Sequence, residues 1–360
     1  MTAASAALKP EQAREMYYYL RLTRSLEEML ARLYRQGKVF GGLYSSLGQE
    51  AVSVGAASAL GPGDWIAPMI RNIGALLVRG IKPREILMQL MAREGSLTHG
   101  KDGTCHMADL HDRHIVAPMS MLGDLIPIMT GVAMAGRYLG HQTVAMTWIG
   151  DGGTSTGAFH EGMNLAAVQK APLVVIVENN QWAYSTPVAR QVPLRDLAER
   201  AGAYGVASHI VDGNDVAAML HVTQQAVAQA RAGQGPVLIE AKTMRMSGHA
   251  QHDPAEYVPR EMIEYWKARD PLDRCRTYLT QNKLWEPATQ AALEARVERE
   301  LEQELAAAEA SPLPQPESAG QGVYCEGCHT IEPRWLRDKD ELTPPKSAAR
   351  AQWTVPDFGG

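Results

Sequence analysis

The segment TVAMTWIGDGGTSTGAFHEGMNLAAVQKAPLVVIVENN, residues 143–180, decides the fold of this chain. It opens with an apolar run at 143–149, ends in a second apolar run at 173–177, and carries a helical pattern at 155–169 between them. Runs that are apolar throughout favour strands buried on both faces. The segment therefore predicts a strand–helix–strand unit with two parallel strands.

The same alternation continues towards the C-terminus. A helical pattern at 216–231 precedes another apolar strand at 236–241. Apolar strands separated by helices predict an α/β fold in which helices cover both faces of a parallel sheet. Ligands of such sheets bind at the carboxyl ends of the strands. Further helices are predicted at 11–36, at 49–60, from near residue 71, after residue 83, and in the charged region through 293–308.

The pattern divides the chain into three parts. Residues 1–40 are predicted to form an N-terminal helical segment, residues 41–280 an α/β domain, and residues 281–360 a helical and extended C-terminal tail. Within the domain, the stretch 97–127 is rich in Gly, His, Asp, Met and Pro and shows no regular periodicity. A long irregular stretch in a compact domain is more often a binding loop than a neutral connector.

The overall composition is that of an ordinary globular protein. The 360 residues are 45% hydrophobic and 21% charged, and their formal net charge is -5. This balance offers no polycationic surface, so we expect no nucleic-acid partner. Residues 1–10 lack the pattern of a secretory signal, and no apolar run approaches the roughly 20 residues of a spanning helix. We therefore expect a cytoplasmic protein with no membrane partner.

Polar residues follow both strands of the 143–180 segment. A GDGG turn at 150–153 ends the first strand, and an Asn pair at 179–180 ends the second. The glycines of the turn leave backbone N–H groups accessible beside the next helix N-terminus, which suits a diphosphate. Asp151 and Asn180 would offer one anionic and one neutral oxygen to a magnesium ion. The turn alone indicates an ordinary tight turn, but its pairing with the Asn residues favours a cofactor site.

These residues resemble the hallmark of the thiamine-diphosphate enzymes, which is Gly-Asp-Gly, a gap of this order and Asn-Asn. The stretch from about 11 to 279 is similar, more closely, to the alpha subunit of the pyruvate and branched-chain 2-oxo acid dehydrogenase family. Three further segments match that family in order, namely LYSSLGQEA at 43–51, GKDGTCHM at 100–107 and TMRMSGH at 243–249. The resemblance implies that residues 41–280 form a thiamine-diphosphate-binding fold.

The resemblance also implies which residues form the active site. The implied cofactor-binding residues are Arg71, Leu122, Gly150, Asp151, Gly152, Gly153, Asn180 and His249. The implied metal ligands are Asp151, Asn180 and the backbone carbonyl of Trp182, and the implied catalytic residues are His249 and His106. Without the resemblance, Arg71 would be a surface arginine at a helix start, and His106 a loop histidine with a structural hydrogen bond. Since a histidine near neutral pKa can transfer protons, His249 is the favoured acid–base group, whereas His252 is expected to be solvated.

The family performs oxidative decarboxylation of a 2-oxo acid and passes the acyl group to a lipoyl arm on an acyltransferase core. The resemblance implies an α2β2 assembly in which the beta subunit supplies the glutamate that activates the cofactor. Glu50 and Glu161 of this chain are accordingly expected to be structural. Pyruvate is the expected substrate, with branched-chain 2-oxo acids and acetoin as alternatives, because the segment at 182–187 also fits the branched-chain type.

A motif near the C-terminus suggests a different class of protein. The sequence CEGCH at 325–329 has the spacing of a c-type haem attachment site, which would make the chain an electron carrier. Haem attachment requires export, for which we find no signal, and a zinc site would lack a second pair of ligands. Two reduced thiols in a tail that packs on a partner are the favoured interpretation.

Overall fold

The computed structural model describes residues 8–323 of the chain. Residues up to Pro314 belong to one compact unit, and Gln315 begins a second unit. The described part of the second unit contains a short 3-10 helix, Pro316–Gly320. The motif at 325–329 lies outside the described residues.

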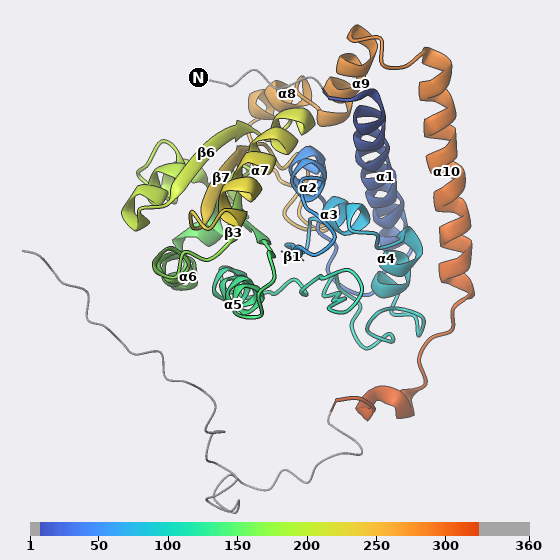
Figure 1. Ribbon diagram of the computed structural model, residues 1–360. Helices are drawn as coiled ribbons and strands as arrows, with labels where there is room; N and C mark the ends of the chain where they lie inside the picture. Colours follow the sequence, from blue (N-terminus) through green and yellow to red (C-terminus); the bar gives the residue numbers. More distant parts are fainter. Residues whose placement is uncertain (1–7, 324–360) are drawn as a thin grey trace, which may run out of the picture. The chain divides into compact units, whose positions relative to one another are not determined.

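Five parallel strands form the central sheet of the first unit (Figure 1). They are β1 (Trp65–Ala67), β2 (Ala145–Gly150), β3 (Leu173–Asn179), β6 (Ala207–Asp212) and β7 (Val237–Lys242). Their order across the sheet is β1-β2-β3-β7-β6, so the two strands of the 143–180 segment lie next to each other. The register pairs Gly150 with Glu178, which brings the GDGG turn and the Asn pair to the same edge. The predicted α/β fold with a parallel sheet is confirmed.

Ten α-helices surround this sheet in the described part of the chain. They are α1 (Pro10–Arg35), α2 (Glu50–Ala57), α3 (Ile73–Val78), α4 (Pro83–Leu90), α5 (Leu125–Tyr138), α6 (Gly157–Val168), α7 (Val216–Arg231), α8 (Arg260–Lys267), α9 (Pro271–Gln281) and α10 (Pro287–Ala310). A two-stranded antiparallel hairpin, β4 (Trp182–Ala183) with β5 (Thr186–Pro187), follows β3.

Alternate residues of β3 point into two hydrophobic cores. Val174 and Ile176 belong to the core beneath α2, α3 and α7, whereas Val175 and Val177 belong to the core beneath α5 and α6. Because both faces of the strand are covered, it is apolar throughout, as the sequence predicts for a sheet buried on both sides. Figure 1 shows α5 and α6 together on one side of the strands and α2 and α3 on the other.

Helices α1 and α10 lie side by side at the outer edge of this arrangement (Figure 1). Tyr17 of α1 donates a hydrogen bond of 2.6 Å to Glu294 of α10. Arg84 of α4 forms an ion pair of 2.8 Å with Glu304, further along α10. The N-terminal helix and the C-terminal extension therefore pack on the same flank of the α/β unit.

Four elements differ from the sequence prediction. Strands β1 and β6 were not predicted, because β1 has three residues and β6 is an edge strand in which the polar residues Ser208 and His209 interrupt the apolar pattern. Helix α5 begins at Leu125, inside the stretch predicted to be irregular through 127. The helix predicted from 155 begins at Gly157, because Thr156 caps it and residues before it form a 3-10 turn.

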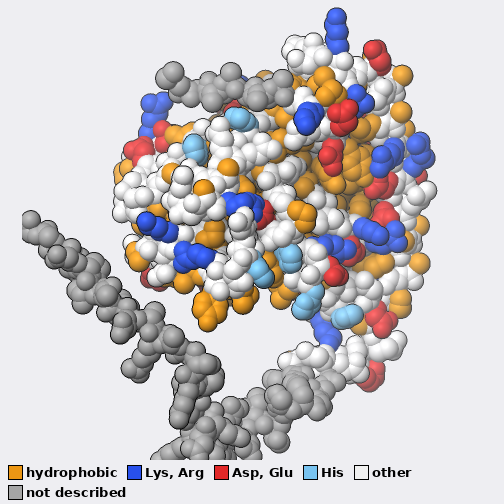
Figure 2. All heavy atoms as spheres, in the orientation of Figure 1, with side chains coloured by type: hydrophobic (Ala, Val, Ile, Leu, Met, Phe, Trp, Pro, Cys, Tyr) orange, Lys and Arg blue, Asp and Glu red, His pale blue; other side chains and the backbone are white. Residues whose placement is uncertain are grey.

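Acidic and basic side chains are intermingled on the molecular face that Figure 2 presents. This mixture accompanies the small net charge of -5. Among residues 8–323, no helix combines the length and the apolar character that crossing a membrane requires.

Candidate active site

A cavity of about 460 Å³ opens at the carboxyl edge of the sheet. Its walls come from the loops that follow β1, β2, β3 and β7, so segments far apart in sequence meet there. The predicted site residues that line it are Arg71, Leu122, Gly150, Asp151, Gly152, Gly153, Asn180, Trp182 and His249. The structure thus brings all but one of the predicted site residues to one cavity.

The glycines of the GDGG turn let the backbone lie close to its neighbours. A Cβ atom on Gly152 would stand 2.4 Å from Cβ of Ala183, and one on Gly153 would stand 2.7 Å from Cγ1 of Ile149. Separations below about 3 Å between carbon atoms are strongly repulsive, so a side chain here would displace the turn or the hairpin. A Cβ on Gly150, by contrast, would meet no atom within 4 Å. The turn forms a closely packed floor under the cavity.

Three oxygen atoms converge on this floor. Oδ1 of Asn180 lies 3.2 Å from Oδ1 of Asp151 and 3.0 Å from the carbonyl oxygen of Trp182. Nδ2 of Asn180 donates to Oε1 of Gln49 at 3.0 Å, which turns the amide oxygen towards the other two acceptors. The other carboxylate oxygen of Asp151 accepts a hydrogen bond of 2.7 Å from Gln191. Reversing the Asn180 amide would let it donate to both oxygens, but Gln49 would then have to reverse as well.

Arg71 places a buried positive charge above this cluster. Its side chain is 6% exposed, and its hydrogen bond to the carbonyl of Ser45 is long, at 3.5 Å. Burial lowers the pKa of Arg71, Glu178 opposes this effect, and nearby Arg245 adds to it. A buried guanidinium with few acceptors favours an anionic ligand, since it has donors left to form charge-assisted hydrogen bonds.

His249 forms another wall of the cavity, between two aromatic rings. The rings of Tyr44 and Tyr184 lie 5.4 Å and 4.8 Å from the imidazole, centroid to centroid. Burial, together with the charges of Arg71 and Arg245, lowers the pKa of His249 to about 4. The imidazole is therefore neutral near pH 7 and a weak base, so it is suited to donate from its ring N–H rather than to take up a proton. The near-neutral pKa on which the sequence argument relied for an acid–base role of His249 is thus wrong.

Arg245 fixes the orientation of His249 and was not singled out by the sequence analysis. Its Nη1 lies 3.3 Å from Nδ1 of His249, so Nδ1 is the acceptor and the neutral ring carries its proton on Nε2. Arg245 also donates to the hydroxyl of Tyr257 at 2.8 Å and to the carbonyl of Tyr184 at 2.9 Å. It stands within the quoted motif at 243–249, but its near-complete burial depends on contacts with distant segments.

His106 lies beside the cavity rather than on its wall. Its Nδ1 contacts Oδ2 of Asp102 at 2.9 Å, and its Nε2 lies 3.3 Å from the hydroxyl of Ser120, which does line the cavity. Although burial opposes the effect, hydrogen bonds from Thr104 and His106 lower the pKa of Asp102. The carboxylate therefore orients the imidazole with Nε2 towards Ser120.

Apolar side chains close the remaining side of the cavity. Leu122 lines it together with Ile70 and Met119, and is 53% exposed in the isolated chain. Glu50 is fully buried in an ion pair with Arg24, and Glu161 is exposed on α6. Neither glutamate lines the cavity, as expected for structural residues.

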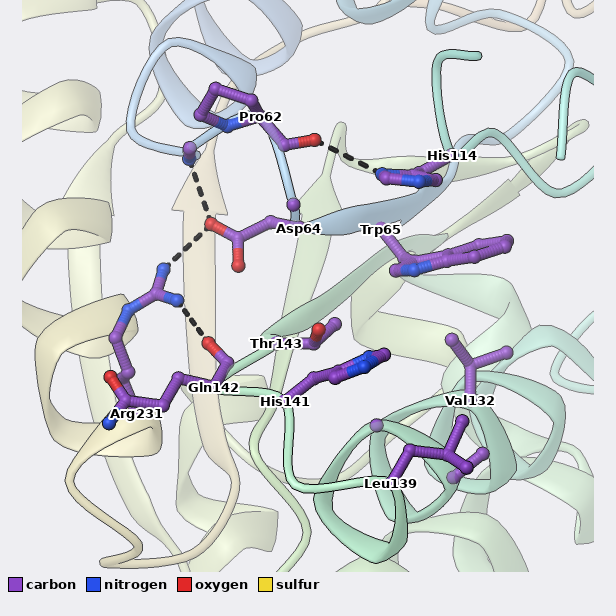
Figure 3. A pocket seen from close by; sticks show the side chains of 14 residues that line it. Pro62, Asp64, Trp65, His114, Val132, Leu139, His141, Gln142, Thr143 and Arg231 are labelled. Atoms are coloured by element: carbon purple, nitrogen blue, oxygen red, sulfur yellow. Dashed lines mark hydrogen bonds and ion pairs between the residues drawn. The ribbon is translucent and has the colours of Figure 1, made fainter. Parts of the chain in front are cut away.

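A larger cavity of about 720 Å³ lies at the opposite, amino edge of the sheet (Figure 3). The rings of Trp65 and His114 stack there, 4.8 Å apart, and Asp64 forms an ion pair of 2.7 Å with Arg231. None of the predicted site residues lines this cavity. The candidate active site is therefore the smaller cavity, where the predicted chemistry is concentrated.

The fold and this site define a class of protein. A parallel α/β sheet carries at its carboxyl edge a GDGG floor, an Asn pair and a buried cation suited to a diphosphate. This combination is that of the thiamine-diphosphate-dependent enzymes.

Comparison with known proteins identifies the family. Residues 18–317 match the family model described as Dehydrogenase E1 component. The chain is 40% identical over 292 residues to the 3-methyl-2-oxobutanoate dehydrogenase subunit alpha of Mycobacterium tuberculosis, covering 80% of this chain and 76% of the relative. It is 34% identical over 281 residues to the pyruvate dehydrogenase E1 component subunit alpha of Rhizobium meliloti, covering 78% and 80%.

A third relative, the pyruvate dehydrogenase E1 component subunit alpha of Rickettsia felis, is 32% identical over 304 residues, covering 84% of this chain and 93% of its own length. The chain belongs to the Dehydrogenase E1 component family. It is an alpha-type subunit of a thiamine-diphosphate-dependent 2-oxo acid dehydrogenase, as the sequence resemblance implies.

Proposed function

We propose that the cavity at the carboxyl edge holds thiamine diphosphate together with Mg²⁺, and that this site oxidatively decarboxylates a 2-oxo acid. The observation that carries the proposal is the convergence of Asp151, Asn180 and the carbonyl of Trp182 below Arg71 and His249. The domain limits predicted from sequence stay part of the proposal, with the cofactor-binding part at 41–280 between flanking segments at 1–40 and 281–360.

The oxygen cluster fits a magnesium ion. In an octahedral site with bonds of about 2.1 Å, neighbouring oxygens stand about 3.0 Å apart. The Asn180 oxygen is 3.0 Å from the Trp182 carbonyl and 3.2 Å from Asp151. Three acceptors this close repel one another unless a cation lies between them. We propose Asp151, Asn180 and the Trp182 carbonyl as the protein ligands, with the remaining positions left to diphosphate and water.

The chain's other residues bind the cofactor and hold protons. Thiamine diphosphate supplies, when bound, the carbon nucleophile for the 2-oxo group and an acceptor for the electron pair released with carbon dioxide. We propose that Arg71 binds the diphosphate and that the floor glycines, Gly150, Gly152 and Gly153, admit it. His249, neutral with its proton on Nε2, donates to negative charge. We propose that His106 is catalytic from beside the cavity, where its Nε2 faces Ser120 of the cavity wall. Leu122 is proposed to support the cofactor with its apolar side chain.

A beta subunit is proposed to complete the site. No glutamate lines the cavity among the described residues, and the one carboxylate of that part of the chain that does line it, Asp151, is proposed as a metal ligand, so no acid is left there to activate the cofactor's aminopyrimidine. Leu122 and Tyr184 on its rim are about half exposed in the isolated chain, which suits coverage by a partner. We propose an α2β2 assembly that transfers the acyl group to a lipoyl-bearing acyltransferase core. The cytoplasmic location stays a prediction.

Pyruvate is the proposed substrate, with a branched-chain 2-oxo acid as the second candidate. Two of the relatives are named pyruvate dehydrogenase, whereas the relative with 40% identity is named for 3-methyl-2-oxobutanoate. The apolar lining of Ile70, Met119 and Leu122 favours an aliphatic group in either case. Acetoin, the third candidate, needs the same apolar lining.

The test is reduction of an artificial electron acceptor by this chain with and without its beta subunit, in the presence of thiamine diphosphate and Mg²⁺. Pyruvate, 3-methyl-2-oxobutanoate and acetoin are compared at equal concentrations. We expect activity only with both subunits and the highest kcat/KM for pyruvate. No turnover of any of these compounds by an assembled pair with bound cofactor would contradict the proposed reaction.

A further inference from the structure

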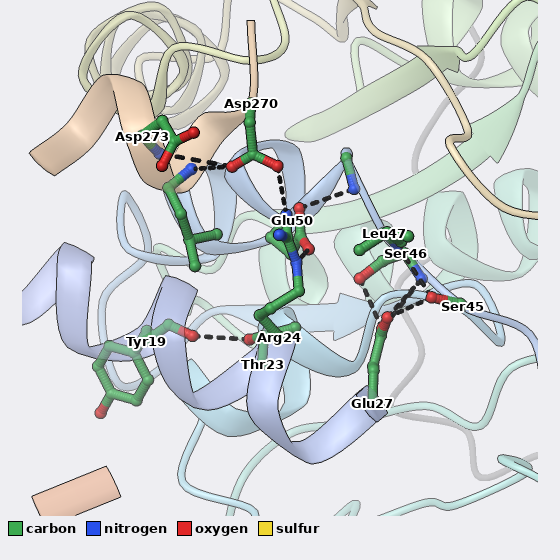
Figure 4. A network of polar contacts seen from close by, with 12 residues as sticks. Tyr19, Thr23, Arg24, Glu27, Ser45, Ser46, Leu47, Glu50, Asp270 and Asp273 are labelled. Carbon is green, nitrogen blue, oxygen red and sulfur yellow. Dashed lines mark hydrogen bonds and ion pairs between the residues drawn. The ribbon is translucent and has the colours of Figure 1, made fainter. Parts of the chain in front are cut away.

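A carboxylate on the N-terminal helix is buried against a loop of the candidate active site (Figure 4). Glu27 of α1 is 6% exposed, and no ion pair with a cation is found for it among residues 8–323. Its Oε2 accepts a hydrogen bond of 2.6 Å from the hydroxyl of Ser45, and its Oε1 accepts one of 2.6 Å from the hydroxyl of Ser46. The backbone N–H of Ser46 donates to both oxygens, at 3.0 and 2.9 Å. Every donor that meets this carboxylate comes from two consecutive residues.

The loop that Glu27 holds, residues 43–48, reaches the cavity at two points. Tyr44 lines the cavity and stands edge-on to His249. The carbonyl of Ser45 accepts the 3.5 Å hydrogen bond from Arg71. The same two serines that bind Glu27 therefore set the position of one aromatic wall and of one acceptor for the diphosphate-binding arginine.

Loop 43–48 also aligns the segment that carries His249. The N–H of Met246 donates to the carbonyl of Leu47 at 3.1 Å, and the N–H of Gln251 donates to the carbonyl of Leu43 at 2.9 Å. These two hydrogen bonds lie on either side of His249 in sequence. Movement of the first loop would therefore shift the imidazole.

Arg24, one helical turn before Glu27, anchors the other end of this loop (Figure 4). It pairs with Glu50 at 2.5 Å and with Asp270 at 3.0 Å. Glu50 in turn accepts a hydrogen bond of 3.0 Å from the N–H of Gly48. The loop is thus held at its middle by Glu27 of α1 and at its end by Glu50 of α2, which is paired in turn with Arg24 of α1.

We propose that Glu27 is a positioning residue for the thiamine-diphosphate site, acting through loop 43–48 on Tyr44, Arg71 and His249. This inference rests on the proposed function and adds to it a residue that touches neither cofactor nor substrate. Buried side chains that orient binding groups commonly change affinity or activity by roughly 10- to 100-fold when they are removed.

The chemistry of the contact predicts which substitution is tolerated. Burial, and then the charge of Glu50, raises the pKa of Glu27 to about 7. Arg71 and Cys105 also interact electrostatically with Glu27. A neutral side chain of the same shape is therefore close in character to the native group, so Glu27→Gln should keep most of the contacts. Glu27→Ala removes them all.

Two measurements on the full chain assembled with its beta subunit test the inference. The first is amide hydrogen exchange, which reports on loops 43–48 and 246–251 whether or not cofactor binds. For Glu27→Ala we expect faster exchange in both loops and unchanged exchange in β3. The second is the Kd for thiamine diphosphate with Mg²⁺, which we expect to rise roughly 10- to 100-fold. Glu27→Gln should restore both values to near those of the wild type.

Matched variants on α1 separate positioning from general destabilisation. Leu30→Ala removes a fully buried side chain one turn further along the helix, and Glu28→Gln removes an exposed charge next to Glu27. We expect neither to change exchange in the two loops. Equal loop exchange in Glu27→Ala and the wild type, or equal loosening by Leu30→Ala, would overturn the inference.

A third variant keeps the test decisive if Glu27→Ala does not fold. Ser46→Ala removes one hydroxyl donor from the same contact but leaves α1 intact, and should loosen the two loops selectively. Wild-type exchange in Ser46→Ala would then refute the positioning role. Failure of the wild-type complex to bind thiamine diphosphate would instead contradict the proposed function. The hydrogen-exchange measurement would still test the role of Glu27, because it does not require bound cofactor.

Discussion

The side-chain oxygens of Asp151 and Asn180 lie 3.2 Å apart at the carboxyl ends of neighbouring strands β2 and β3. Two acceptors at this distance need either a cation between them or a reversed amide that donates to the carboxylate. The two arrangements respond differently to an added negative charge at position 180.

Asn180→Asp distinguishes these arrangements. In EDTA, we expect the paired buried carboxylates to lower the free energy of unfolding by about 2 kcal/mol or more. With Mg²⁺ we expect most of the loss to be recovered, because a cation between the carboxylates neutralises their repulsion. Thermal melting in EDTA and in Mg²⁺ measures both effects, with Asn164→Asp on the exposed face of α6 as the control. An equal loss of stability in both conditions would indicate the hydrogen-bonded amide.

Gly152→Ala should damage the floor of the cavity. Its Cβ would stand 2.4 Å from that of Ala183, so the turn or the hairpin must move, at a cost of about 1–3 kcal/mol. Gly202→Ala is the matched control, because its Cβ would meet no atom within 4 Å. Urea unfolding and cofactor titration of the two variants should show a loss for the first and none for the second. Wild-type cofactor affinity in Gly152→Ala would show that the floor does not depend on this close approach.

The low pKa of His249, about 4, predicts the sign of a pH effect on stability. The unfolded chain takes up this proton near the ordinary value of about 6.5, so it binds the proton more readily than the folded chain does. Above about pH 6.5 His249 is neutral in both states and does not lower the free energy of unfolding. As the pH falls from about 6.5 towards 4, the unfolded chain takes up the proton first, so the free energy of unfolding decreases. Between roughly pH 7 and pH 5, we expect His249→Gln to lose less unfolding free energy than the wild type. Replacement of exposed His252 serves as the control, and equal pH dependence of wild type and His249→Gln would refute the shift.

Tyr257→Phe should loosen the loop that carries His249. The Tyr257 hydroxyl donates to Asp253 at 2.5 Å and accepts from Arg245 at 2.8 Å, so its loss leaves two charged groups less well bonded. We expect a loss of about 1–2 kcal/mol in unfolding free energy, with allowance for partial exposure of the loop. Tyr265→Phe, on an exposed face of α8, should change nothing. Denaturant titration of both variants decides the matter.

The sheet and its site could be predicted because strand and ligand signals coincide in one segment. Residues 143–180 show two apolar strands, and the residues directly after each strand must meet at the carboxyl edge whatever the rest of the chain does. Helix α7, predicted at 216–231, begins at Val216 and ends at Arg231 because Asp215 caps a strongly periodic segment. Local pattern and tertiary contacts agree at these places.

The residues that sequence reasoning missed depend on long-range burial. Arg245 and Glu27 carry charges that usually mark a solvated surface, yet each is buried by segments distant in the chain. Asp102 stands in the quoted motif at 100–107, but its role becomes visible only through its hydrogen bond to His106. A charged residue four positions before a motif histidine carries no periodic signal that separates a buried partner from a solvated one.

The most direct test of the central claim is the binding of thiamine diphosphate to the chain assembled with its beta subunit, measured by titration in Mg²⁺ and in EDTA. The wild type should bind tightly only with Mg²⁺, and Asp151→Ala should lose at least roughly 100-fold in affinity. Asp112→Ala, which removes an exposed carboxylate outside the cavity, should bind like the wild type. Tight binding by Asp151→Ala, or binding of equal strength in EDTA, would contradict the claim that Asp151 anchors the cofactor through a metal ion.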